Sequence, residues 1–304
     1  MIKTVQYKDT TWVDIQDPKL ADVQYLEKQF GLRGRVLEEL IPPAHRAKIE
    51  HHEQYLFMIL YDPALDKKKK EIFSRELDII VSKDRLITSH YVPIEPVNAL
   101  FDEIAASEEK QLECMTKGAG HLLFCIIKAM FDDDLEELNY IERKIDYIEQ
   151  KMFRGEEKKM VFEISVARRD IIDFRRILAP QATIMDSLKS DGPRILGEEL
   201  SYHFQYLRDQ FEIVEDAIED HKETIQGLAE TNQALLTTKI NEIIQILTVL
   251  SVIFLPITLT ANLWGMNFDF LPLTHSPFGF WVIAGTIAMT LLGLMTYFKK
   301  KKWL

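Results

Sequence analysis

The sequence predicts an α+β domain, followed by a long stalk helix and a two-helix transmembrane hairpin. Short runs rich in Val, Ile, Phe and Tyr occupy the first hundred residues, which is typical of strands. From about residue 112 onward, apolar residues recur at helical spacing. Residues 243–264 and 278–298 contain no Asp, Glu, Lys or Arg. Each of these two runs is long enough, as a helix, to cross a hydrocarbon layer of ~30 Å.

The charge distribution separates an acidic body from a basic membrane part. Residues 245–304 carry four lysines and one aspartate, and they leave a net −14 for the rest of a chain whose formal net charge is −11. An acidic body argues against a nucleic-acid partner. Cys114 and Cys125 have no metal-ligand spacing, which fits a reducing cytosol. The first residues form no apolar signal segment, so we expect the body to stay inside the cell.

The first hundred residues mix strand and helix signals. Strands are predicted at 11–15, 55–61, 77–81 and 85–90, and helices at 21–30 and 34–40. The four lysines at 67–70 fit a solvated hairpin tip. His51 and His52 are neighbours on a predicted strand, so they point to opposite faces and cannot share one zinc ion there. No Gly-rich phosphate loop or nucleophile motif is present in the sequence, so we do not expect an enzyme.

The middle of the chain reads as a helical hairpin followed by one very long helix. Apolar residues from Leu138 to Met152 step by 3, 4, 3 and 4, Gly155 breaks the pattern, and a second run continues from Met160 to Leu178 before Pro180. No proline interrupts the stretch between Arg194 and Leu255. A helix over 198–264 would be ~100 Å long and would join the acidic body to the membrane.

Between the two apolar runs lie residues 265–267 and then only the ten residues 268–277, which predicts a tight hairpin. Lys239 precedes the first run, and four lysines at 299–302 follow the second. The positive-inside rule then places both termini in the cytoplasm and residues 265–267 at the outer mouth. The predicted regions are 1–110 (cytosolic α/β domain), 111–196 (cytosolic helical hairpin), 197–242 (stalk), 243–267 (first transmembrane helix and mouth), 268–277 (outer loop), 278–298 (second transmembrane helix) and 299–304 (basic tail).

One stripe of the first membrane helix is unusually polar. Its members step by 3, 3, 4, 4, 3 and 4, which keeps them on one side of a supercoiling helix. Polar side chains in a membrane need partners or water, so the stripe is either a helix–helix contact joined by Ser and Thr or the lining of a pore. Two helices cannot enclose a pore, so a pore requires several symmetric copies. The stripe, hereafter the polar stripe, consists of Asn241, Ile244, Leu247, Ser251, Leu255, Thr258 and Asn262.

These residues carry a family resemblance. The combination of Asn241-Glu242, Leu247-Thr248, Pro256 and Gly265-Met266-Asn267-Phe268 resembles the CorA magnesium transporters. Trp12-Val13-Asp14-Ile15, Lys48-Ile49-Glu50 and the basic tail fit the same pattern, so the resemblance covers essentially the whole chain. It implies a multi-pass homopentamer in the lipid bilayer of the cell (inner or plasma) membrane, with the first membrane helix lining the pore and the second facing lipid.

The resemblance also implies roles for particular residues. It implies a divalent cation channel that takes up Mg²⁺ down its electrochemical gradient, with Gly265, Met266 and Asn267 forming the selective mouth. A ring of Asn267 carbonyls would accept hydrogen bonds from the water shell that Mg²⁺ gives up reluctantly. Ile244, Leu247 and Leu255 would form apolar constrictions. Regulatory Mg²⁺, bound between cytosolic domains, would hold the pore shut, and a rough alignment places its ligands near Asp66 and Asp209.

Several features leave the ion and even the class of protein open. Where the family has Met-Pro-Glu in the outer loop, this chain has Leu271-Pro272-Leu273, and Asp269 is the loop's only carboxylate. Cation concentration at the mouth should therefore be weaker. A Zn²⁺ or Co²⁺/Ni²⁺ transporter on the same scaffold is the alternative, although Met266 disfavours zinc. A membrane-anchored scaffold or signalling protein is the alternative from another class, and the polar stripe argues against a simple anchor.

Overall fold

The computed structural model describes residues 1–30, 40–41, 46–66, 71–266 and 278–303. The chain divides into two compact units, Met1–Ala229 and Glu230–Leu304, which are described separately. The predicted helix at 34–40 lies outside the described residues except for Leu40, and so does the lysine run at 67–70.

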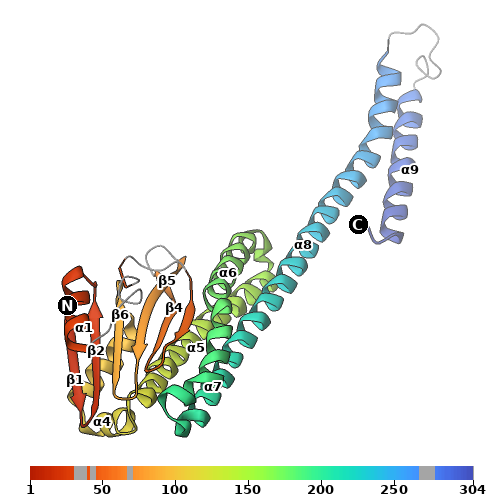
Figure 1. Ribbon diagram of the computed structural model, residues 1–304. Coiled ribbons are helices and arrows are strands. Elements are labelled where there is room, and N and C mark those ends of the chain that lie inside the picture. Colours follow the sequence, from red (N-terminus) through yellow and green to blue (C-terminus); the bar gives the residue numbers. More distant parts are fainter. Residues whose placement is uncertain (31–39, 42–45, 67–70, 267–277, 304) are drawn as a thin grey trace. The chain divides into compact units, whose positions relative to one another are not determined.

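The first unit contains a six-stranded mixed sheet (Figure 1). Its order is β1-β2-β6-β5-β4-β3, and every neighbouring pair is antiparallel except β2 and β6, which run parallel. The predicted strands are confirmed, with β4 and β5 longer than expected, whereas β1 and β3 were not predicted. The strands are β1 (Ile2–Tyr7), β2 (Thr10–Gln16), β3 (Lys48–His51), β4 (Leu56–Asp66), β5 (Glu71–Val81) and β6 (Arg85–His90).

Strand β2 is buried on both faces of the sheet. Successive side chains of a strand point to opposite faces, and the four consecutive residues from Trp12 to Ile15 are all buried. Val13 and Ile15 join one apolar core with Leu26 of α1 (Leu20–Phe30). On the other face, the Trp12 ring packs edge-on against Phe101, with 4.8 Å between ring centroids. The Trp12 Nε1–H donates to Thr88 Oγ1 at 3.0 Å, and the Thr88 hydroxyl donates to Asp14 Oδ1 at 2.7 Å. These two hydrogen bonds join Trp12 and Asp14 of β2 through the Thr88 hydroxyl of β6.

Helices account for the rest of the first unit. The predicted hairpin is confirmed as α5 and α6, joined by a π turn in which Gly155 adopts a left-handed φ of 91°. The apolar residues that predicted its seam are buried. The Nζ of Lys144 on α5 contacts Asp170 Oδ2 on α6 at 3.0 Å. The helices are α3 (Glu95–Ala106), α4 (Glu108–Met115), α5 (Ala119–Lys151), the π turn (Met152–Glu156), α6 (Glu157–Leu178), a 3-10 turn (Ala179–Gln181), α7 (Ala182–Leu196) and a second 3-10 turn (Glu198–Leu200).

The longest element, α8, runs from Ser201 to Gly265 without interruption. The predicted long helix is confirmed, except that its first three residues form the 3-10 turn. In the first unit, α8 buries an apolar stripe that includes Phe204, Leu207 and Phe211. In the second unit, α8 is followed by α9 (Gly279–Lys300). Within the described residues, the chain has two helices that are long and apolar enough to cross a membrane, one ending at Gly265 and the other being α9.

Candidate functional site

The second unit contains a helical hairpin made of the end of α8 and α9 (Figure 1). Along α8, six less exposed residues recur at steps of 4, 4, 4, 3 and 4, with Pro256 beside them, and they mark the face that the hairpin covers. Along α9, six less exposed residues follow the same steps, with Ala284 beside them, so the two covered faces are similar in spacing. The covered residues are Gln245, Val249, Ile253, Ile257, Thr260 and Trp264 on α8, and Gly279, Ile283, Ile287, Leu291, Leu294 and Phe298 on α9.

The polar stripe lies on the opposite side of α8 from this covered face. Leu247, Ser251, Leu255 and Asn262 each follow a covered residue by two positions, which is a rotation of ~200° around the helix. All seven members of the stripe are exposed in the single chain. The contact between α8 and α9 therefore does not account for the polar stripe, which faces away from the hairpin partner.

The hydroxyl groups of the stripe are oriented by the helix itself. Ser251 Oγ donates to the Leu247 carbonyl at 2.8 Å, and Thr258 Oγ1 donates to the Phe254 carbonyl at 2.9 Å. A hydroxyl that has given its only proton to the backbone presents lone pairs to its surroundings. Both side chains are consequently hydrogen-bond acceptors on the exposed face, which suits a ligand that donates.

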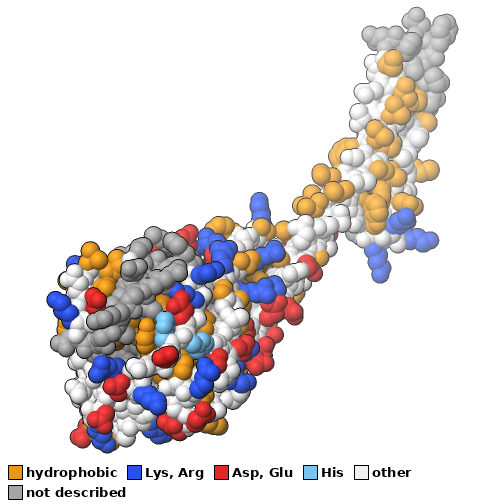
Figure 2. All heavy atoms as spheres, viewed as in Figure 1, with side chains coloured by type: hydrophobic (Ala, Val, Ile, Leu, Met, Phe, Trp, Pro, Cys, Tyr) orange, Lys and Arg blue, Asp and Glu red, His pale blue; other side chains and the backbone are white. Residues whose placement is uncertain are grey.

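Large apolar side chains alternate with these polar ones. Ile244, Leu247 and Leu255 are 53%, 57% and 70% exposed, which is a large apolar surface for one chain to leave uncovered. Figure 2 shows hydrophobic side chains along the visible face of the hairpin. Pro256, although it has no N–H to donate to the Val252 carbonyl, does not interrupt α8.

The predicted mouth is described only in part. Gly265 is the last residue of α8, and among the described residues no heavy atom beyond its chain neighbours and its own helix backbone lies within 4 Å of a Cβ placed on it. These described residues therefore impose no packing need for glycine at this position. Met266 is 47% exposed. Asn267, together with the predicted outer loop at 268–277, lies outside the described residues.

The two predicted regulatory aspartates belong to different elements of the first unit. Asp66 ends β4, directly opposite Glu71 in the sheet register. Asp209 lies exposed on α8, where it accepts a 2.5 Å hydrogen bond from Gln205 Nε2. Within the part of the chain that the structure describes, no three His, Cys, Asp or Glu side chains converge to hold a metal ion. A complete site at these aspartates would therefore need ligands from outside this described set.

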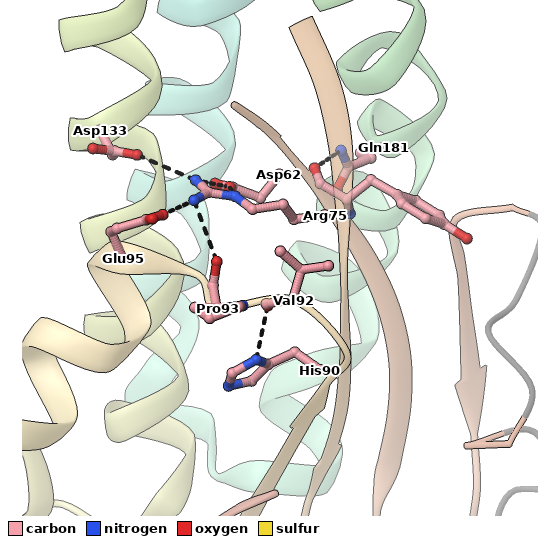
Figure 3. A network of polar contacts seen from close by, with 9 residues as sticks. Asp62, Arg75, His90, Val92, Pro93, Glu95, Asp133 and Gln181 are labelled. Atoms are coloured by element: carbon pink, nitrogen blue, oxygen red, sulfur yellow. Dashed lines mark hydrogen bonds and ion pairs between the residues drawn. The ribbon is translucent and has the colours of Figure 1, made fainter. Parts of the chain in front are cut away.

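The structure also contains a buried charge network that was not predicted (Figure 3). Arg75 on β5 lies opposite Asp62 on β4 in the sheet register, and its Nε donates to Asp62 Oδ2 at 2.6 Å. The Arg75 guanidinium also pairs with Glu95 of α3 and lies 3.7 Å from Asp133 Oδ2 of α5. The signal available in the sequence was an acidic residue, Asp62, and a basic residue, Arg75, on two strands that follow one another. To predict that they pair requires the register of these strands.

Comparisons with known proteins agree on one family. The model of the CorA-like Mg²⁺ transporter protein family matches residues 7–300. The cobalt/magnesium transport protein CorA of Thermotoga maritima is 28% identical over 296 residues, covering 97% of this chain and 83% of that protein. The zinc transport protein ZntB of Pectobacterium atrosepticum is 26% identical over 199 residues, covering 61% of this chain and 57% of that protein.

Solved structures show that the fold is shared as well. The complete CorA magnesium transporter of Methanocaldococcus jannaschii matches with a TM-score of 0.85 at 22% identity, covering 99% of this chain and 94% of that one. This match confirms the predicted fold class, an α+β domain followed by a long helix and two apolar helices. The expectation that the chain is not an enzyme is confirmed by its family. The chain belongs to the CorA-like Mg²⁺ transporter protein family and is a membrane transporter of divalent cations.

Proposed function

We propose that the chain is a subunit of a homo-oligomeric, pentameric Mg²⁺ channel whose pore is lined by the polar stripe of α8. The observation that carries the proposal is the placement of the stripe on the side of α8 that faces away from α9. In a symmetric ring, this placement lets α9 cover the lipid side while the stripes of several copies enclose one axis. Mg²⁺ is preferred because the cobalt/magnesium transport protein of T. maritima matches this chain over nearly its whole length.

The chemistry of the stripe suits a hydrated cation. The waters around Mg²⁺ point their hydrogens outward, and the ion sheds them reluctantly. Ser251 and Thr258 present acceptor oxygens because their hydroxyl groups already donate their protons to backbone carbonyls. Such oxygens can accept from the water shell without displacing it. A bare cation gains no comparable ligand set here, because one hydroxyl per turn does not replace an octahedral shell.

In the proposed channel, the remaining residues have distinct roles. Gly265, Met266 and Asn267 form the outer mouth, where the Asn267 carbonyls select the hydrated ion. Rings of Leu247 and Leu255, with Ile244 beside them, close the pore by excluding water. Both termini lie in the cytoplasm, as the four lysines at 299–302, at the end of α9, favour.

Cytosolic Mg²⁺ regulates the channel through Asp66 and Asp209 in this proposal. The ligands come from neighbouring copies, because the described part of one chain holds no complete metal site. Bound Mg²⁺ would favour the closed assembly because Mg²⁺ binds the closed assembly more tightly than the open assembly.

Metal uptake into liposomes tests the ion preference. The purified full chain is reconstituted into lipid vesicles, and the uptake rates of Mg²⁺, Zn²⁺, Co²⁺ and Ni²⁺ are compared at equal concentration. Mg²⁺ should enter fastest. If Zn²⁺ enters faster than Mg²⁺, the second candidate function holds, a zinc transporter on the same scaffold, which the similarity to the ZntB protein over 61% of this chain favours. If no metal enters, the helices serve as an anchor for a scaffold or signalling protein.

Cysteine accessibility tests the pore lining directly. Ser251 and Thr260 both donate their hydroxyl protons to helix carbonyls, at 2.8 and 2.7 Å, but Ser251 lies on the stripe and Thr260 on the covered face. In the reconstituted channel, Ser251→Cys should react with a charged, water-soluble thiol reagent and lose Mg²⁺ flux. Thr260→Cys is the matched control and should react no faster than the unmodified chain, which carries Cys114 and Cys125. Equal reactivity at both positions would remove the stripe from the pore.

A further inference from the structure

The buried charge network of the first unit contains more negative than positive groups. Asp62 is 1% exposed and Arg75 is 5% exposed, so their ion pair is shielded from water. Asp134 on α5 is also buried, at 3% exposed. The charged groups facing Asp134 are Asp62 from β4, Arg75 from β5, and Asp133 and Glu137 from α5 itself. Glu95 of α3 approaches the same guanidinium (Figure 3).

Hydrogen bonding does not compensate for this excess of negative charge. Both Asp62 Oδ1 and Asp134 Oδ1 are buried, and neither atom has a hydrogen-bond partner among the residues that the structure describes. Arg75 donates to Asp62 Oδ2 at 2.6 Å and also reaches the Pro93 carbonyl at 3.4 Å, so its donors are shared among several acceptors. An ionised carboxylate without donors is far more costly to bury than a neutral carboxylic acid. A buried Asp134 among more carboxylates than cations would therefore be stabilised by a positive ligand.

That ligand is either a metal ion or a proton. Among the residues that the structure describes, no three carboxylate, imidazole or thiol side chains converge closely enough for a metal. A proton needs only one carboxylate. We propose that Asp134 binds a proton at neutral pH and that this proton stabilises the packing of α5 against β4 and β5. The proposal concerns the first unit alone and does not depend on the ion pathway proposed above.

The electrostatics of the site support this choice. Burial is the largest cause that raises the pKa of Asp134 well above its ordinary range, and the neighbouring Asp62 raises it further. Burial also raises the pKa of Asp62, to about 7, although Arg75 opposes that shift. Arg75 lowers the pKa of both carboxyl groups, but it also donates a hydrogen bond to Asp62, so Asp134 is the member that holds its proton more tightly.

The proposal predicts the direction of a pH effect. When α5 opens away from the sheet, Asp134 becomes hydrated and loses its proton above about pH 4. The closed form then holds one proton more than the open form, so raising the pH favours opening. The opening equilibrium should rise up to about tenfold per pH unit until Asp134 ionises in the closed form too. The packing of α5 against the sheet should consequently be most stable on the acidic side of neutrality.

Infrared spectroscopy of the full chain in detergent tests the proton itself. At about pH 7 the unmodified chain should show the carbonyl band of a protonated carboxylic acid. Asp134→Asn should remove the part of this band that persists in Asp62→Asn, because Asp62, whose pKa is raised to about 7, contributes the rest. Asp133→Asn is the matched control: it is the adjacent residue on α5, its side chain is 33% exposed, and its loss should leave the band in place. Asp62→Asn removes the nearest negative charge, so it should shift the midpoint of the band to lower pH.

Amide hydrogen exchange of α5 tests the consequence. With Asp134→Asn as the reference for the intrinsic pH dependence of exchange, opening in the unmodified chain should increase about tenfold per pH unit near neutrality. A chain without the acid band near neutral pH would overturn the proposal, and so would a folded Asp134→Asn variant whose band is undiminished. Loss of the band on adding Mg²⁺ would also overturn it, because a metal would then be the ligand. If Asp134→Asn does not fold, the Asp62→Asn midpoint still decides: an unshifted midpoint refutes the assignment.

Discussion

Replacing Arg75 by methionine should destabilise the first unit far more than the loss of an ordinary ion pair. Methionine retains most of the apolar length of the side chain but leaves Asp62 buried without the Nε–H that now donates at 2.6 Å. Breaking a buried pair in this way costs about 3–5 kcal/mol. For a unit of roughly 200 residues, each kcal/mol lowers the melting temperature by about 2–4 °C, so a decrease of roughly 6–20 °C is expected.

The assay is thermal unfolding of the full chain in detergent, followed by circular dichroism. Arg194→Met is the matched control, since Arg194 is 72% exposed and lies 3.9 Å from Asp191 in an exposed pair that contributes about 0–1 kcal/mol. The decrease should be larger at about pH 8 than at about pH 6, because Asp62 can relieve its own burial by taking up a proton at the lower pH. If both variants melt within a few degrees of each other, the network does not stabilise the fold.

Three further predictions concern the proposed channel. Asn267→Ala should abolish Mg²⁺ uptake into liposomes while the oligomer still elutes normally from a sizing column, and normal uptake would remove Asn267 from selection. Leu247→Gly or Leu255→Gly should raise the resting leak, measured as uptake at high internal Mg²⁺, because the constriction loses its side chains; an unchanged leak would exclude that residue as the gate. Asp66→Asn combined with Asp209→Asn should leave the channel open at high internal Mg²⁺ and abolish Mg²⁺ protection of α8 from protease, and a double variant that closes normally would place the sensor elsewhere.

The sequence predicted strands well where burial is two-sided and poorly where it is not. The predicted strand 85–90 coincides with β6, whose residues after Arg85 are all buried. β1 was missed because only Val5 of its six residues is buried, so its alternation carries little apolar signal. β3 was missed because none of its four residues is buried. β5 extends to Glu71 through a half that is mostly not buried and that is held by its pairing with β4.

The candidate site follows the same physical logic. The polar stripe could be predicted because a helix fixes side-chain direction from spacing alone, and the covered face of α8 is consistent with that assignment. The network around Arg75 could not be predicted, because it joins β4, β5, α3 and α5. Asp62 and Asp133 are 71 positions apart, and only the tertiary fold brings them to one guanidinium. Periodicity contains no information about such contacts.

The parallel pairing of β2 with β6 determines when the sheet can form during synthesis. Trp12 is buried by Thr88 and Phe101, so the N-terminal hairpin has no complete core until about residue 101 has left the ribosome. At about 5–20 residues per second this wait lasts roughly 4–18 s, during which the edge of β2 that later pairs with β6 is open to chaperones. The first membrane run, beginning at residue 243, follows roughly 7–28 s later. The sheet thus has time to close before the nascent chain offers its membrane segment to the insertion machinery.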